Sequence, residues 1–223
     1  MDMQRRQTGF TLIEISIVLV IIGLILGGAL KGQELIQSAK VRSTINQLDG
    51  VKAAYYAFQD RYRALPGDYS QATVNLPASP PGTTVASGTG NGQIAGGAEL
   101  GQVWLHLGVA GFLSGSFDGN TGGNVYNCPD TTCLTNAFSG AMHLGFNDEA
   151  TGTTAFSHEL ISGRRIPVEI IAEIDRKIDD GRPTSGTFQS SKNGAFSSCV
   201  SGNDWNIIAT SPSQDCSGVI VGL

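Results

Sequence analysis

The pattern of apolar and polar positions separates the start of the chain from everything that follows it. From Phe10 to Leu30 almost every residue is apolar, and Glu14 is the one ionisable side chain in this run. A helix over these residues is about 31 Å long at about 1.5 Å per residue, which is enough to cross the core of a bilayer. The pattern therefore predicts a membrane-spanning helix at residues 10–30, preceded by a short polar segment with Arg5 and Arg6.

A different pattern continues the same helix. From Val41 onward an apolar residue recurs every three or four positions, which is the spacing of one helix face. Pro66 and Gly67 follow, and the residue before a proline avoids helical backbone. We therefore expect one long helix from about Phe10 to Ala64, apolar all round at first and amphipathic over residues 31–65. The amphipathic face consists of Val41, Ile45, Leu48, Val51, Tyr55, Phe58, Tyr62 and Leu65.

The remaining residues, 66–223, are expected to form a globular head. Residues 66–98 are dominated by Gly, Ser, Thr, Pro and Ala, which predicts a surface-exposed loop. Helices are predicted at residues 99–113 and from Pro167 to the Gly181 turn. This order predicts an α+β fold, in which the long helix packs on an antiparallel sheet with short extra helices. The strands are expected at residues 123–127, 137–146, 153–156, 187–188, 195–200, 205–210 and 219–221.

Glu14 is unusual for its position. A carboxylate at the centre of a bilayer costs on the order of 2.5–3.5 kcal/mol, so Glu14 calls for a partner. Cleavage after Gly9 would free a cationic amine on Phe10. In a stack of identical helices, the amine of one helix can meet the carboxylate of the next. Arg5 and Arg6 before the apolar run favour a cytoplasmic N-terminus, with the rest of the chain across the membrane.

The run Gly9-Phe10-Thr11-Leu12-Ile13-Glu14, followed by an apolar helix, resembles the cleavage and methylation motif of type IV prepilins and type II secretion pseudopilins. The family has Gly before the cut, Phe after it and Glu as the fifth mature residue. The resemblance implies a leader at residues 1–9, cleavage by a prepilin peptidase and methylation of the Phe10 amine. It also implies assembly into a helical filament, in which Glu14 neutralises the N-terminus of a neighbour.

The resemblance implies a pilin-like fold and a structural function. The chain would be a subunit of a type IV pilus-like filament, held first in the bacterial inner membrane with its head in the periplasm. Its partners would be the prepilin peptidase, an inner-membrane assembly platform and other pilins. A type II secretion pseudopilin fits the same motif. An anchored periplasmic binding module that never polymerises is an alternative from another class of function. For the apolar run itself, the alternatives are a plain signal anchor and a secretory signal.

Charge and motif content argue against two other classes of function. The 223-residue chain has 14 Lys and Arg against 19 Asp and Glu. Removing Arg5, Arg6 and Asp2 with the leader leaves 12 against 18, a formal charge of −6. This balance offers no basic surface for nucleic acid. The sequence also lacks the common nucleophile, phosphate-binding and dinucleotide motifs, so an enzyme is not expected.

Four cysteines, Cys128, Cys133, Cys199 and Cys216, lie beyond the apolar helix, where disulfides persist. Four cysteines allow three connectivities, and we favour Cys128–Cys133 and Cys199–Cys216. A zinc site is the competing interpretation. It is disfavoured because the chain has no Cys-x-x-Cys pair and its three histidines are scattered.

No cofactor is expected, but two segments are candidates for calcium. Asp175, Asp179 and Asp180 cluster at a predicted helix end, where a solvated helix end is the plainer interpretation. The segment from Ser87 to Glu99 resembles an EF-hand loop only loosely. Its first and third positions are not Asp, and Glu99 falls one residue late.

Glycines interrupt the apolar helix, which lacks the mid-helix proline of many pilins. Gly23, Gly27, Gly28 and Gly32 each lower helix propensity by about 1 kcal/mol. One hypothesis is that residues 23–28 extend when a filament assembles. The other is that these small residues let neighbouring helices approach closely.

Overall fold

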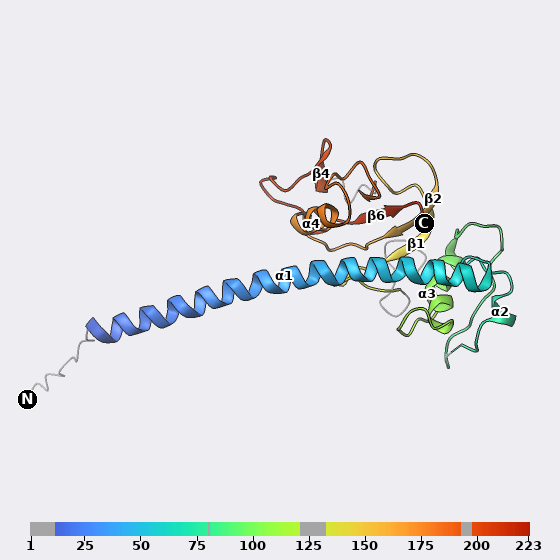
Figure 1. The fold of residues 1–223 in the computed structure, drawn as a ribbon, viewed down its shortest axis with the longest axis horizontal. Helices are drawn as coiled ribbons and strands as arrows, with labels where there is room; N and C mark the ends of the chain where they lie inside the picture. The colour runs from blue at the N-terminus through green and yellow to red at the C-terminus, as the bar shows by residue number, and fades with distance from the viewer. Residues whose placement is uncertain (1–11, 80, 121–132, 193–197) are drawn as a thin grey trace, which may run out of the picture. The chain divides into compact units, whose positions relative to one another are not determined.

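The computed structural model describes residues 12–79, 81–120, 133–192 and 198–223 (Figure 1). Two compact units divide within the first helix, between Ala39 and Lys40. The predicted α+β fold, with a long N-terminal helix and a later antiparallel sheet, is confirmed. The elements are α1 (Leu12–Tyr62), α2 (Ala72–Asn75), α3 (Gly97–Val109), β1 (His143–Asn147), β2 (Ser157–Ile161), α4 (Val168–Ile178), β3 (Phe188–Ser190), β4 (Val200–Ser201), β5 (Asp204–Trp205) and β6 (Gly218–Val221).

The second half of α1, from Lys40 to Tyr62, supplies the predicted apolar face to the core of the head. Apart from the adjacent pair Ala54 and Tyr55, its buried residues are spaced three or four positions apart, as an amphipathic helix requires. The helix ends at Tyr62, two residues before the predicted end, because Arg63 adopts a left-handed φ of 52°. The buried apolar residues of this face are Val41, Leu48, Val51, Ala54, Tyr55 and Phe58.

The head is built on a four-stranded antiparallel sheet with the order β1-β2-β6-β3. Leu160 on β2 and Phe188 on β3 both pair with Ile220 on the central strand β6, and all three side chains are buried. β4 and β5 form a separate two-stranded pair. The core between the sheet and the helices includes Leu144, Ile171 and Ile174 as well.

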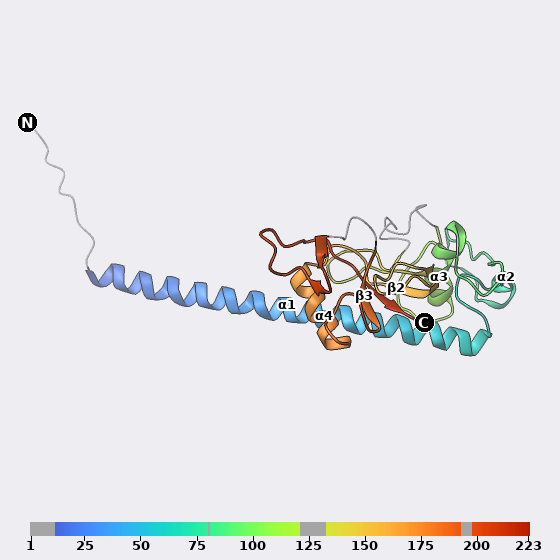
Figure 2. The same ribbon diagram turned by 90° about the horizontal axis from the view of Figure 1, so that it is seen from above.

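Helices flank the sheet at different places along it. α3 contacts β1, whereas α4 contacts β3 and β5. Figures 1 and 2 both show α3 beside the C-terminal part of α1 and α4 farther back along the same helix. Trp104 of α3 is fully buried, as expected for a core residue. α4 spans the residues predicted for it, with Pro167 as its N-cap and a left-handed Gly181 after its end.

Several strand predictions need correction. The predicted strand at 153–156 is wrong, because Thr153 and Ala155 form tight turns, and the strand β2 begins afterwards at Ser157. Residues 137–140 form a turn before β1, and 206–210 form a turn after β5. The predicted strand at 123–127 and the first half of the one at 195–200 lie outside the described residues, and only Val200 of the second half is in a strand, β4.

The prediction that residues 66–98 form an exposed loop is only half right. Much of the segment is exposed, but it contains the short helix α2 and buries Asp68, Tyr69 and Ile94. The physical reason lies on α3, where a row of polar side chains binds the backbone of this segment. That row is Glu99, Gln102 and His106, all buried and spaced three and four residues apart.

Candidate functional site

The sequence motif lies at the beginning of the described part of the chain. Gly9 and Phe10, the predicted processing residues, fall outside the described residues. Glu14 lies in the first turn of α1 and is exposed. The hydroxyl of Ser16 donates to the carbonyl of Leu12 across 2.8 Å within the same turns of the helix. The predicted assembly residue therefore sits on regular helix in the first unit.

The helix around Glu14 exposes an unusual amount of apolar surface. Leu12 is 87% exposed and Leu24 72% exposed, and large aliphatic side chains between and beyond them are exposed as well. Contiguous surfaces of this kind mark membrane or protein interaction sites in folded proteins. Within the described residues, α1 is the one helix long and apolar enough to cross a membrane.

Charged residues return where the apolar run ends. Lys31 and Glu34 form an exposed ion pair with a 2.6 Å separation between Nζ and Oε2. Glu14 is the only charged side chain from Leu12 to Leu30. One acidic group thus lies inside an apolar surface.

The three candidate calcium ligands do come together. One carboxylate oxygen each from Asp175, Asp179 and Asp180 lies within 4.8 Å of the others. Each carboxylate already accepts hydrogen bonds from protein donors. Asp175 accepts from the indole of Trp205, Asp179 from the N–H of Thr187, and Asp180 from the hydroxyl of Ser185.

These hydrogen bonds give the cluster a structural role. Burial raises the pKa of Asp175 to about 6, although hydrogen bonds from Trp205 and the Gly181 N–H favour its ionised form. The exposed carboxyl of Asp180 has a lowered pKa because Ser185 and the Arg182 N–H donate to it. A cation would compete with these donors for the same oxygens. Calcium binding here stays a prediction.

The second calcium candidate is organised by internal hydrogen bonds. Glu99 accepts from the N–H and hydroxyl of Thr89, both at 2.9 Å, and from the Ala95 N–H at 3.0 Å. Asp68, which sequence reasoning did not single out, accepts from Gly90 N–H at 2.6 Å and Gly92 N–H at 2.7 Å. Both carboxylates therefore hold the loop through its own backbone.

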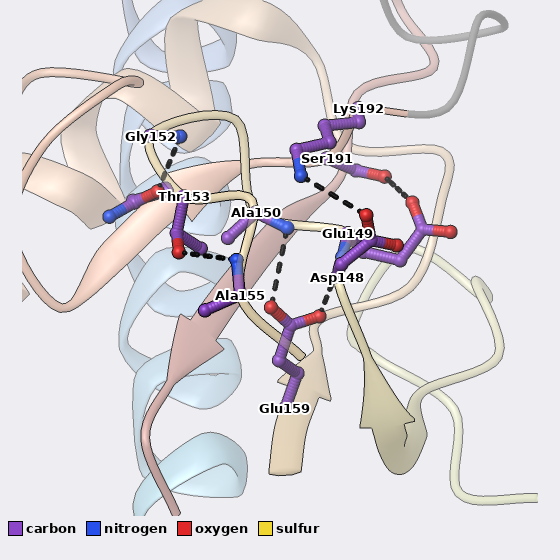
Figure 3. A network of polar contacts seen from close by, with 10 residues as sticks. Asp148, Glu149, Ala150, Gly152, Thr153, Ala155, Glu159, Ser191 and Lys192 are labelled. Carbon is purple, nitrogen blue, oxygen red and sulfur yellow. Dashed lines mark hydrogen bonds and ion pairs between the residues drawn. The ribbon is translucent and has the colours of Figure 1, made fainter. Parts of the chain in front are cut away.

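A further buried carboxylate, Glu159 on β2, organises the turn between β1 and β2 (Figure 3). It accepts N–H groups of Glu149 at 2.8 Å and Ala150 at 3.4 Å, while Glu149 accepts the Ser191 hydroxyl at 3.0 Å. Burial raises the pKa of Glu159, and the nearby charges of Glu149 and Asp148 add to the effect. This network joins the β1–β2 turn to the end of β3, and no sequence spacing pointed to it.

Cysteine pairing agrees with a head that folds in an oxidising compartment. Cys199 and Cys216 form a disulfide, the pairing favoured from the sequence, with a Cα–Cα distance of 5.8 Å. Cys133 is also disulfide-bonded. Its expected partner, Cys128, lies outside the described residues.

Comparison with known proteins identifies the N-terminal segment. Residues 4–30 match the family model of the prokaryotic N-terminal methylation motif. No curated protein and no solved structure matches the chain significantly. The matched residues include Gly9, Phe10 and Glu14 and most of the exposed apolar helix. The motif suggests a structural subunit rather than an enzyme, and the apolar helix fits anchoring in the inner membrane. The chain thus carries the N-terminal methylation motif that marks type IV prepilin and pseudopilin proteins.

Proposed function

We propose that the chain is a structural subunit of a type IV pilus-like filament. It is made as a single-pass prepilin in the bacterial inner membrane, with its head in the periplasm. A prepilin peptidase cleaves it after Gly9 and methylates the new amine of Phe10. An assembly platform in the inner membrane then transfers it from the membrane into a filament, where it contacts further copies of itself or related pilins.

One observation carries this proposal: the methylation motif coincides with an apolar helix whose side chains are exposed in the single chain. Lipid covers such a surface before assembly, and neighbouring helices cover it afterwards. The change in α1 at Val41, from exposed to buried apolar residues, supports a helix whose two parts have different functions. The first part is available for assembly, whereas the second part belongs to the head.

Glu14 supplies the specific contact in this proposal. An acidic group inside an apolar assembly surface is costly unless a cation meets it. After cleavage, the methylated amine of Phe10 in an adjoining subunit is a cation of the right kind. Pairing of these two groups fixes the axial position of one subunit against the next.

The test compares filament formation by the Glu14→Ala variant with that by the Glu34→Ala variant. Glu34 is the matched control, because it is an exposed glutamate on the same helix beyond the apolar run. Glu14→Ala is expected to abolish filaments under the electron microscope, whereas Glu34→Ala leaves them intact. Mass spectrometry of the purified wild-type chain is expected to find a methylated Phe10 at the N-terminus. Normal filaments from Glu14→Ala would instead favour an anchored binding module.

The motif fits a type II secretion pseudopilin equally well. In that case the filament is short and moves cargo outward instead of extending from the cell surface. Microscopy of cells at native expression separates the two: surface filaments support the pilus. Filaments that appear only when the chain is overexpressed, together with a secretion defect in its absence, support the pseudopilus.

A further inference from the structure

Two histidines hold opposite ends of the loop that precedes α3. His106 on α3 accepts the backbone N–H of Gly67 at Nδ1 across 3.0 Å. Its Nε2 donates to the carbonyl of Ala86 across 2.9 Å. His158 on β2 accepts the backbone N–H of Ile94 at Nε2 across 3.3 Å. We call residues 67–79 and 81–94 the clasped loop, since the two imidazoles bind both of its ends.

Both contacts require a neutral imidazole. An imidazolium carries a proton on each nitrogen and has no acceptor, so it cannot receive an N–H donor. Protonated His106 would turn an N–H toward the N–H of Gly67, and protonated His158 would do the same to Ile94. Each event leaves a buried or half-buried donor without its partner, which is the costly way to lose a hydrogen bond.

The surroundings of the imidazoles oppose protonation in the closed loop. His106 is fully buried, and its ring stacks on Phe58 of α1 with 6.2 Å between centroids. Burial lowers the pKa of His106 from 6.5 to about 4, and no charged side chain among the described residues shifts it. Half-buried His158 lies against Phe146 of β1 and Tyr55 of α1.

One nearby charge favours protonation of His158. The carboxylate of Asp68, within the clasped loop, favours the imidazolium, but desolvation is the larger effect and the pKa of His158 is lowered. Tyr55 is the titratable group of α1 at this ring, and burial raises its pKa to about 12, so it stays neutral in mild acid. Glu159, the next residue along β2, accepts N–H donors of the β1–β2 turn.

We propose that His106 and His158 form an acid-sensitive latch, and that their protonation releases the clasped loop from α3 and the sheet. The opening has a defined consequence, because the loop buries Tyr69, Ala72 and Leu76 in the head. It also forms one wall of a surface pocket of about 320 Å³ beside the end of α1. Acid would therefore expose apolar side chains and remodel that pocket without unfolding the sheet.

The size of the effect follows from the two protonation states. The pKa of His106 is about 4 in the closed loop. If opening the loop restores the ordinary imidazole pKa of about 6.5, opening becomes about twentyfold more favourable at pH 5 than at pH 7. The sign is fixed: the closed loop binds fewer protons than the open one, so acid favours opening. His158 adds to this change in the same direction.

The test measures hydrogen exchange by NMR on the full chain in detergent micelles, with intrinsic exchange rates corrected for pH. Protection of the Gly67 and Ile94 amides is expected to fall at least twentyfold from pH 7 to pH 5. Protection of Leu160 and Ile220, in the centre of the sheet, is expected to stay far higher than that of Gly67 and Ile94 at both pH values. Equal protection of the loop and sheet amides at pH 5 would mean that the loop opens only by global unfolding, and would overturn the proposal.

Variants then identify the groups that titrate. The double variant His106→Gln, His158→Gln keeps amide donors and acceptors but cannot gain charge, so its loop is expected to lose the pH response. The control, His143→Gln, removes the third histidine, and its loop is expected to keep the pH response. If the double variant responds like the wild type, the carboxylates Asp68 and Glu99 control the loop and the latch is wrong.

The double variant could fail to fold, which its sheet amides would reveal at pH 7. The decisive measurement is then the titration of the His106 and His158 ring signals in the wild-type chain. The pKa of each ring must lie below about 6.5, and Gly67 and Ile94 must lose protection progressively between that pH and the ring pKa. Ring pKa values that are not lowered, or constant protection of Gly67 and Ile94 across this range, would overturn the proposal.

Discussion

Trp205 donates its indole N–H to a carboxylate oxygen of Asp175 across 2.7 Å, and both side chains are buried. Trp205 lies on β5, inside the loop that the Cys199–Cys216 disulfide closes, whereas Asp175 lies on α4. The hydrogen bond therefore attaches the disulfide-bonded loop to the helix. The indole N–H is also one of the donors that satisfy the buried carboxylate of Asp175.

Replacing Trp205→Phe keeps an aromatic ring and removes the donor. We expect a loss of about 1–3 kcal/mol in the free energy of unfolding, because Asp175 loses one of its hydrogen bonds while it stays buried. The pKa of Asp175 should rise above its present value of about 6. Urea denaturation of the full chain in detergent, followed by circular dichroism, measures the first effect. An unchanged midpoint would show that the bond contributes nothing.

Asp175→Asn tests the charge itself. The pKa of Asp175 is raised from 3.8 to about 6 by burial, so protonation favours the folded state. Its contribution to stability is full below pH 3.8 and is lost as the pH rises through 6. The asparagine variant should lack this dependence. Compared with the wild type at the same pH, the asparagine variant should therefore have its denaturation midpoint lowered less at pH 7 than at pH 4.

His143→Leu should make the head more resistant to acid. Both ring nitrogens of His143 are buried and lack a hydrogen-bond partner within the described residues. Burial lowers the pKa of His143 from 6.5 to about 4. Its neutral form therefore supports folding above pH 6.5, and this support is lost as the pH falls toward 4, by about 3 kcal/mol in all.

Leucine removes that proton-binding group and fills a similar volume. Denaturation at pH 7 should show the leucine variant at least as stable as the wild type, because an unpartnered polar group has been replaced. At pH 4.5 the gap between the two proteins should widen in favour of the variant. Equal acid sensitivity in both proteins would assign the effect to other groups.

Gly218→Ala should damage the core, whereas Gly50→Ala should not. A Cβ at Gly218 on β6 would overlap the ring of Phe188, which is fully buried. Overpacking of this kind costs about 1–3 kcal/mol. At Gly50 on α1 no atom lies within 4 Å of an added Cβ, so alanine should gain up to about 1 kcal/mol of helix propensity. Thermal unfolding of both variants should therefore shift in opposite directions.

The helices α3 and α4 of the head were predictable from sequence, because residues close together in the chain define them, whereas the short helix α2 was not predicted. The spacing of Val168, Ile171 and Ile174, with Pro167 before them and Gly181 after them, defines α4 without reference to any other segment. The motif from Gly9 to Glu14 is local in the same sense. Residue types alone define this candidate site, because its positions are counted along the chain.

The clasped loop and β2 were not predictable, because the contacts that stabilise them join residues far apart in the sequence. Glu99 and His106 resemble polar surface residues of a helix, yet each binds backbone of a segment that precedes it. β2 contains His158 and Glu159, which make its sequence resemble a polar turn. Their buried polar atoms are satisfied by the backbone of Ile94 and Ala150, and no spacing along the chain encodes those contacts.

The glycines of the apolar helix provide the last prediction. Residues 23–28 are helical, and no atom lies within 4 Å of a Cβ added at Gly23, Gly27 or Gly28. The triple alanine variant should therefore keep the helix in the single chain and raise its propensity by about 1 kcal/mol at each position. If this segment must extend during assembly, the variant should form fewer filaments at the same amount of cleaved protein.

The alternative is that the glycines allow helices to approach closely, as small residues do in membranes. Alanine is small enough to permit that approach, so the triple alanine variant would then assemble normally. Leucine at the same three positions would block it. Filament counts for the alanine and leucine variants, with Gly50→Ala as a control outside the apolar run, separate the two mechanisms. We expect the alanine variant to be impaired, because an extended segment requires the helix to melt where its propensity is lowest, and alanine removes that weakness without adding bulk.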